Sequence, residues 1–265
     1  MEFETVRLIL AIQAMIAGDP APLAAYQDES AEYREIVIVE PAAVAYWPMH
    51  GEVVSHDLRA WSEALSQREG ARAYLSLKRI PLFLERPSNI LEDVVGYGPE
   101  YVSAIMCVET VAERNAYWIS DNWVLDQRRL SLWQLEEWPE DCAPTGPGAE
   151  EATLALGNAL NLLIEYTSEV FGDDSIWIRD YLTPHLNLLG TDGASRTAFQ
   201  EMLVPGQRRM LLEAAFGLGI FGGMGSWSDH YPPEGYEEQQ QEALEAWSAA
   251  TEMALMSAVN VESSD

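Results

Sequence analysis

Phe221-Gly222-Gly223-Met224-Gly225-Ser226-Trp227-Ser228-Asp229 is the stretch around which the expected fold is organised. It follows an apolar run with helical spacing and precedes the last acidic segment of the chain. Three glycines within four positions allow backbone conformations that side chains would forbid. Ser226, Ser228 and Asp229 can then cap the start of another helix. The stretch therefore predicts a tight turn between two helices.

Helical patterns surround this turn throughout the second half of the chain. Apolar residues recur at helical spacing over 156–171, and Gly172-Asp173-Asp174 ends that stripe. The same periodicity predicts a final long helix over 233–259. Shorter helices are expected between them, over 175–182, 183–190, 192–204 and 206–218.

The first half shows helical patterns interrupted by one β-branched run. Helices are predicted over 2–17, from a cap at Ser55, over 71–79, and from Pro99 to about Arg114. Ile36-Val37-Ile38-Val39, closed by Pro41, fits either a short strand or a buried helix end. The predicted fold class is therefore mostly α, an array of short antiparallel helices with room for a small β element around residues 36–54.

Proline and glycine mark one boundary inside the chain. Residues 138–148, Trp-Pro-Glu-Asp-Cys-Ala-Pro-Thr-Gly-Pro-Gly, hold three prolines and two glycines. Such a segment continues neither a helix nor a strand. We therefore expect an N-terminal half over 1–138 and a C-terminal half over 149–265, joined by a linker or surface loop over 139–148.

The charge of the chain narrows the class of partner. Among 265 residues, 43 are acidic and 15 are basic, which gives a formal net charge of -28. Direct binding to nucleic acid is disfavoured because phosphates would be repelled. A protein partner with a basic surface is favoured, although solubility alone is the other interpretation. From Met210 onward the chain contains no Lys or Arg, so this end should carry the strongest negative field.

Cysteine content and hydropathy bear on location. Cys107 lies in an apolar run and is expected in the core, and two cysteines make no disulfide framework. A reducing compartment is the simplest expectation. The apolar segment 8–17 lacks the positive leading region of a signal peptide, and no run approaches the roughly 20 apolar residues of a membrane span. These observations predict a cytoplasmic protein without membrane contact.

No catalytic pattern stands out in the sequence. Gly217-x-Gly219-x-x-Gly222 follows a predicted helix instead of the strand that a dinucleotide site requires. Gly225-Ser226-Trp227 does not fit a Gly-x-Ser-x-Gly nucleophile elbow. We therefore expect no enzyme activity, no catalytic or metal-ligating residues, and no cofactor.

One segment resembles a known family. Residues 211–216, Leu-Leu-Glu-Ala-Ala-Phe, followed by the 221–229 stretch, resemble the Phe-Gly-Gly-Met-Gly-Ser-x-Asn-Asp ending of small helical immunity proteins from bacterial polymorphic or contact-dependent toxin systems. Ser228 stands where that ending has Asn. The resemblance covers about residues 211–230 and implies a stoichiometric inhibitor, which occludes the active site of a cognate toxin with a basic surface.

The predicted partner-binding residues lie at and after this stretch: Trp227, Asp229, Glu237, Glu238, Glu242 and Glu245. The alternative function is an acidic regulatory or DNA-mimicking protein, which would sequester a nucleic-acid-binding partner. Physically, the glycine-rich stretch also fits a helix-to-helix turn with no direct role in binding.

Overall fold

The computed structural model describes residues 3–29, 33–42, 52–81, 100–124, 127–135, 138–139, 142, 145–172, 180, 182–184, 187, 207–217 and 232–260. These residues fall into two compact units. The first takes its described residues from Met1–Lys78 and Val102–Pro144, and the second from Arg79–Tyr101 and Thr145–Val261. The domain division proposed from the sequence, 1–138 and 149–265, stays a prediction.

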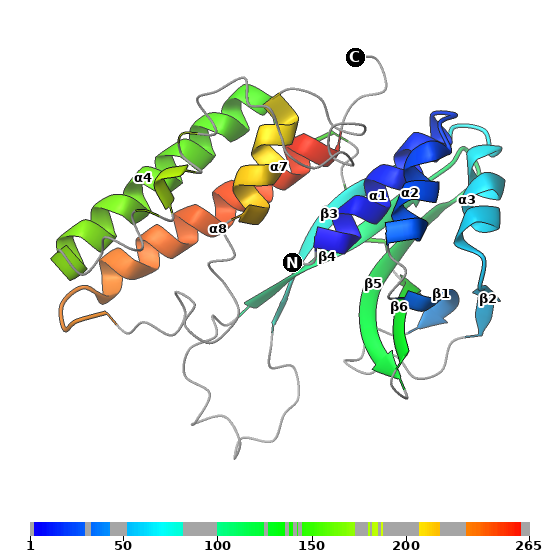
Figure 1. Ribbon diagram of the computed structural model, residues 1–265, viewed down its shortest axis with the longest axis horizontal. Coiled ribbons are helices and arrows are strands. Elements are labelled where there is room, and N and C mark those ends of the chain that lie inside the picture. The colour runs from blue at the N-terminus through cyan, green and yellow to red at the C-terminus, as the bar shows by residue number, and fades with distance from the viewer. Residues whose placement is uncertain are drawn as a thin grey trace. The chain divides into compact units, whose positions relative to one another are not determined.

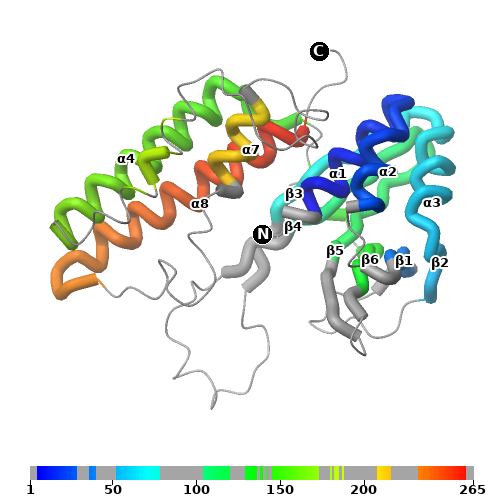
Figure 2. The backbone as a smooth tube through the Cα atoms, in the orientation of Figure 1, coloured from blue at the N-terminus to red at the C-terminus, as the bar shows by residue number. Residues whose placement is uncertain are grey.

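The chain begins with helices and then alternates between strands and one further helix (Figures 1 and 2). Along it come α1 (Phe3–Ile16), α2 (Ala21–Glu29), β1 (Tyr33–Ala42), β2 (Val53–Ser55), α3 (Leu58–Ser66), β3 (Arg72–Pro81), β4 (Glu100–Glu109), β5 (Arg114–Val124) and β6 (Gln127–Leu135). Three further described helices follow: α4 (Ala149–Phe171), α7 (Gln207–Gly217) and α8 (Glu237–Val259).

The strands form a six-stranded mixed sheet in the order β2-β1-β6-β5-β4-β3. Strand β1 runs parallel to β6 and antiparallel to β2, and β5 runs antiparallel to both β4 and β6. Strands β1 and β6 are therefore neighbours in the sheet, although the other four strands lie between them in the sequence. Paired residues such as Trp118 and Trp133 share one face of the sheet.

The predicted fold class, mostly α or all-α with a small β element, is wrong. The β-branched run at 36–39 does lie in a strand, β1, but it belongs to this six-stranded sheet. The helices expected over 71–79 and from Pro99 to Arg114 are instead strands β3 and β4. The first unit therefore combines a mixed sheet with helices.

Burial on both faces explains this error. The five consecutive residues from Ala104 to Val108 are all buried, and so are the four from Ala73 to Ser76. A strand covered on both sides loses the alternation of apolar and polar residues that identifies a half-exposed strand. In such a continuous apolar run, apolar residues also stand three and four positions apart, so the run fits the pattern of a helix as well.

Helices α1 and α3 pack against one face of the sheet. Gln13 of α1 donates its Nε2 hydrogen to the carbonyl of Ala73 on β3, at 2.8 Å. Trp61 of α3 lies edge-on to Tyr117 of β5, with ring centroids 5.5 Å apart. Asp57 caps α3, since its Oδ1 accepts a hydrogen bond from the Ala60 amide at 3.0 Å. The helix predicted over 2–17 is confirmed as α1.

The second unit contains the helices that the sequence predicted best. The stripe over 156–171 lies in α4, the segment 206–218 forms α7, and the final long helix is α8. Leu160 and Leu163 of α4 and Trp247 of α8 are buried in this unit. The Phe221–Asp229 stretch and most of the helices expected over 175–204 lie outside the described residues.

The two cysteines are bonded to each other, although the sequence led us to expect no disulfide framework. Cys107 is fully buried, as predicted, but it forms a disulfide with Cys142. The spacing alone did not show this pairing, because 35 residues separate the two positions and a sheet brings them together. No helix in the described part of the chain is long and apolar enough to cross a membrane.

Candidate interaction surface

The predicted partner-binding glutamates lie on the first half of α8. Glu237, Glu238, Glu242 and Glu245 are all exposed. At about 100° per residue, Glu238, Glu242 and Glu245 fall within an arc of about 60° around the helix. Three carboxylates can therefore face the same partner.

The start of α8 is built to hold negative charge. Gly235 adopts a positive φ of 94°, which turns the chain into the helix, and its amide donates to Glu237 Oε2 at 2.8 Å. The N-cap residue, Tyr236, makes no side-chain cap hydrogen bond. Carboxylates in the first turn interact favourably with the partial positive charge of the helix N-terminus. The acidic residues thus stabilise the helix that presents them.

Helix α4 lies beside α8 and runs in the opposite direction (Figure 1). The Gly146 amide, just before α4, donates to the carbonyl of Asn260, just after α8, at 3.2 Å. The acidic first turns of α8 are therefore at the same end of the pair as the last turns of α4. Glu165 and Glu169 are exposed there.

A shallow apolar groove follows the seam between the two helices. Most of its side chains are alanines, which leave the helix backbones close to the surface. Its lining is Ala155, Asn158, Ala159 and Leu162 from α4, and Ala246, Ala249, Ala250 and Met253 from α8.

Acidic residues continue the groove-lining faces beyond both ends of the groove. Glu242 precedes Ala246 by four residues, and Glu169 follows Leu162 by seven, so each lies on the groove side of its helix. At the other end, Glu151 precedes Ala155 by four residues. We call these three glutamates, with Glu238, Glu245 and the groove lining, the α4–α8 face.

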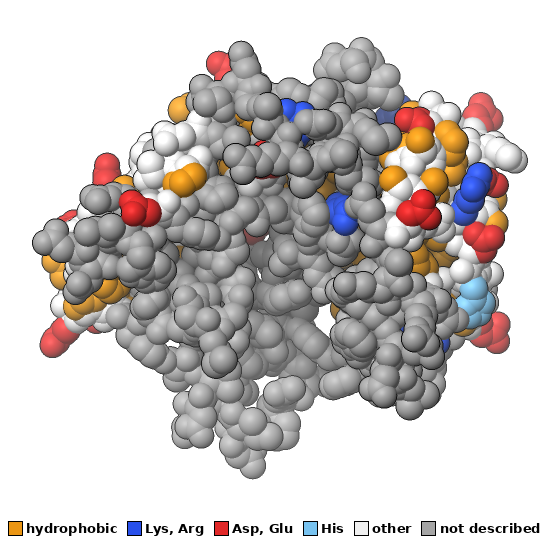
Figure 3. All heavy atoms as spheres, in the orientation of Figure 1, with side chains coloured by type: hydrophobic (Ala, Val, Ile, Leu, Met, Phe, Trp, Pro, Cys, Tyr) orange, Lys and Arg blue, Asp and Glu red, His pale blue; other side chains and the backbone are white. Residues whose placement is uncertain are grey.

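The α4–α8 face has no opposing positive charge in its own helices. Neither the α4 nor the α8 sequence contains a Lys or Arg residue. Figure 3 shows acidic side chains on the described surface of these helices, at the left of the view. The face combines an apolar centre with negative ends, which suits a partner that is apolar along a ridge and basic beside it.

Two buried tyrosines of the sheet have a raised pKa. Burial raises the pKa of both Tyr74 and Tyr117 to about 12, so both hydroxyls stay protonated near neutral pH. In the described ranges, no group of three or more His, Cys, Asp or Glu residues is arranged to hold a metal ion.

The structure brings together only part of the predicted site. The four α8 glutamates share one helix, whereas Trp227 and Asp229 lie outside the described residues. Sequence reasoning missed the contribution of α4, although alanines four residues apart at 155 and 159 and at 246 and 250 hinted at close helix contact. Comparisons with family models, curated proteins and solved structures find no match for this chain.

Proposed function

We propose that this protein is an immunity protein, which binds a cognate bacterial toxin and covers its active site. The observation that carries this proposal is the α4–α8 face, an apolar groove with carboxylates beyond both ends and no cation in either helix. The resemblance of residues 211–230 to immunity proteins agrees with it. Both features lie in the same C-terminal part of the chain.

The chemistry of the face supports inhibition by binding. Toxins that act on nucleic acids carry basic substrate clefts, because they must neutralise phosphates. Exposed carboxylates accelerate encounter with such a cleft and set its orientation. The apolar groove then supplies surface that loses water on contact, which is where most of the affinity of an interface originates. We place this encounter in the cytoplasm, where an incoming toxin would meet its targets.

Co-expression with the product of the neighbouring gene tests the proposal. That product should arrest growth when expressed alone, and this protein should restore growth and form a stable complex with it. Restoration should weaken when Glu238, Glu242 and Glu245 are all replaced by Lys. With three charges reversed at one face, we expect affinity to fall by about 10- to 100-fold and to become less dependent on salt.

A matched control distinguishes the effect of charge on the α4–α8 face from the effect of the net charge of the protein. Lys at Glu52, Glu63 and Glu69, which are exposed in the first unit, makes the same change in net charge. This control should protect as well as the native chain. The proposal fails if the neighbour is harmless, if the native protein does not protect, or if both triple variants lose protection equally while remaining folded.

A further inference from the structure

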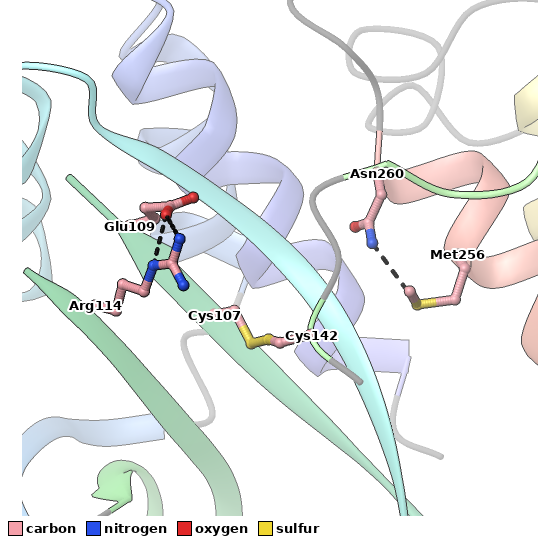
Figure 4. Close-up of a disulfide and its surroundings, with 6 residues drawn as sticks. All are labelled: Cys107, Glu109, Arg114, Cys142, Met256 and Asn260. Atoms are coloured by element: carbon pink, nitrogen blue, oxygen red, sulfur yellow. Dashed lines mark hydrogen bonds and ion pairs between the residues drawn. A yellow bond between two sulfur atoms is a disulfide. The ribbon is translucent and has the colours of Figure 1, made fainter. Parts of the chain in front are cut away.

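The disulfide joins the sheet to the segment that follows β6. We call the described residues of that segment, Trp138, Pro139 and Cys142, the strap. Met106 of β4 pairs with Tyr117, which faces α3, and the next residue, Cys107, points to the opposite side of the sheet. The strap is therefore tied to the face that α3 does not cover. Figure 4 shows the disulfide between Cys107 and Cys142.

Ring contacts hold the strap beside the disulfide. Trp138 lies edge-on to Tyr74, with ring centroids 6.1 Å apart. The guanidinium of Arg114 lies 5.6 Å from the centre of the Trp138 ring, and Arg114 also pairs with Glu109 at 2.7 Å. Between them, Arg114 and Tyr74 offer one charged and one aromatic surface to the indole.

The strap covers a small core of its own. Tyr74, Ile105, Cys107 and Ala116 form a buried cluster on this side of the sheet, and Leu135, Trp138 and Cys142 pack against it. Inside the strap, the Cys142 amide donates to the Pro139 carbonyl at 3.2 Å. One covalent bond and a few side-chain contacts thus keep water from an apolar part of the sheet.

We propose that Cys107 and Cys142 form a reversible redox latch, which closes the strap over the sheet when oxidised and releases it when reduced. The chain supplies both sulfurs and has no other cysteine. Disulfides are uncommon in a reducing cytoplasm, so a pair positioned to bond there responds to changes in redox conditions. The latch rests on the cytoplasmic location given with the proposed function, but it belongs to the first unit and does not depend on toxin binding.

The two sulfurs differ in solvent exposure, which determines which of them a reductant attacks first. Cys107 is fully buried, whereas Cys142 is partly exposed. A thiolate of a dithiol reductant attacks the Cys142 sulfur and forms a mixed disulfide, and Cys107 leaves as a thiolate that takes up a proton. The second thiol of the reductant then displaces Cys142 as a thiol. Two electrons and two protons pass to the protein, and a disulfide such as oxidised glutathione reverses the reaction.

The full-length protein tests the latch through three measurements made with and without dithiothreitol. Mass spectrometry after alkylation counts free thiols, thermal unfolding reports stability, and the emission difference between the native chain and Trp138→Phe reports the strap. Reduction should free both thiols and lower Tm by roughly 10 °C. It should also shift the emission of Trp138 toward that of an indole in water, and oxidised glutathione should restore the starting state.

Two variants separate the latch from simple reagent effects. Cys142→Ser should show the emission and Tm of the reduced native chain, with or without dithiothreitol. Cys107→Ala/Cys142→Ala provides a second reduced-like chain if the serine variant does not fold. The proposal is overturned if the air-oxidised native protein has two free thiols, if reduction leaves both Tm and Trp138 emission unchanged, or if oxidised glutathione does not restore the bond.

Discussion

Replacing Gly146 with Ala should destabilise the helical unit strongly. A Cβ at this position would lie 2.6 Å from the Met256 carbonyl carbon and 2.9 Å from the Ser257 nitrogen, and closer still to the Met256 carbonyl oxygen. Backbone atoms at the end of α8 cannot rotate away as a flexible side chain could. Forcing extra volume into such a contact costs about 1–3 kcal/mol.

The same substitution should also break a hydrogen bond. The Gly146 amide donates to Asn260, and a displaced backbone would lose this bond, worth about 1 kcal/mol. We therefore expect Gly146→Ala to reduce the free energy of unfolding by about 2–4 kcal/mol. Urea unfolding followed by far-ultraviolet circular dichroism measures this loss, because α4 and α8 supply much of the helical signal.

Gly157→Ala is the matched control for this prediction. Gly157 lies inside α4, and a Cβ there would meet no atom within 4 Å. The same chemical change should stabilise the protein by about 0.5–1 kcal/mol, because alanine loses less backbone entropy in a helix. If Gly146→Ala unfolds at the native urea concentration, the end of α8 does not approach the start of α4 as described.

Substitutions at two positions, Tyr117 and Asp57, test the sheet unit. Burial raises the pKa of Tyr117 from 10.0 to about 12, so the stability it contributes is complete below pH 10 and is lost as pH rises toward 12, an effect of up to about 3 kcal/mol. Tyr117→Phe should therefore reduce the fall in stability between pH 10 and 12 in denaturant titrations, and an unchanged pH profile would contradict the assignment. Asp57→Ala should cost about 1 kcal/mol in thermal unfolding because α3 loses its cap, whereas Asp57→Asn should keep most of it.

Helix signals in this sequence were most informative where a helix has one buried side. In α4, the buried residues include Leu156, Leu160 and Leu163, whereas Glu165 and Glu169 are exposed on another side of the helix. That contrast gives a clear 3.6-residue period and a clear end at Gly172. The prediction of α4 was confirmed for this reason. Helix α1 was also predicted correctly, although its residues from Leu8 to Ile12 are all buried and show no such contrast.

Sheet pairing could not be predicted from local patterns in the same way. Strand β6 pairs in parallel with β1, which lies about 90 residues earlier in the chain. The sequence of neither strand indicates which other strand it pairs with. The disulfide could not be predicted for the same reason, because Cys107 and Cys142 are 35 residues apart and are neighbours only in the folded structure. For the candidate surface, the sequence was enough to select the α8 glutamates. The contribution of α4 could be seen only from the antiparallel packing of α4 against α8.

The positions of the acidic residues bear on the proposed binding role. Carboxylates in the first turn of α8 agree with the helix dipole, so Glu237 and Glu238 would be expected on stability grounds alone. Glu169 lies in the last turn of α4, where a negative charge is locally unfavourable and a cation would be preferred, and Glu165 lies one turn earlier. A chain selected only for charge could place carboxylates on many other exposed positions. Their location at the same end of the pair as the α8 glutamates is what the proposed binding role requires, because a basic partner would then neutralise both helices together.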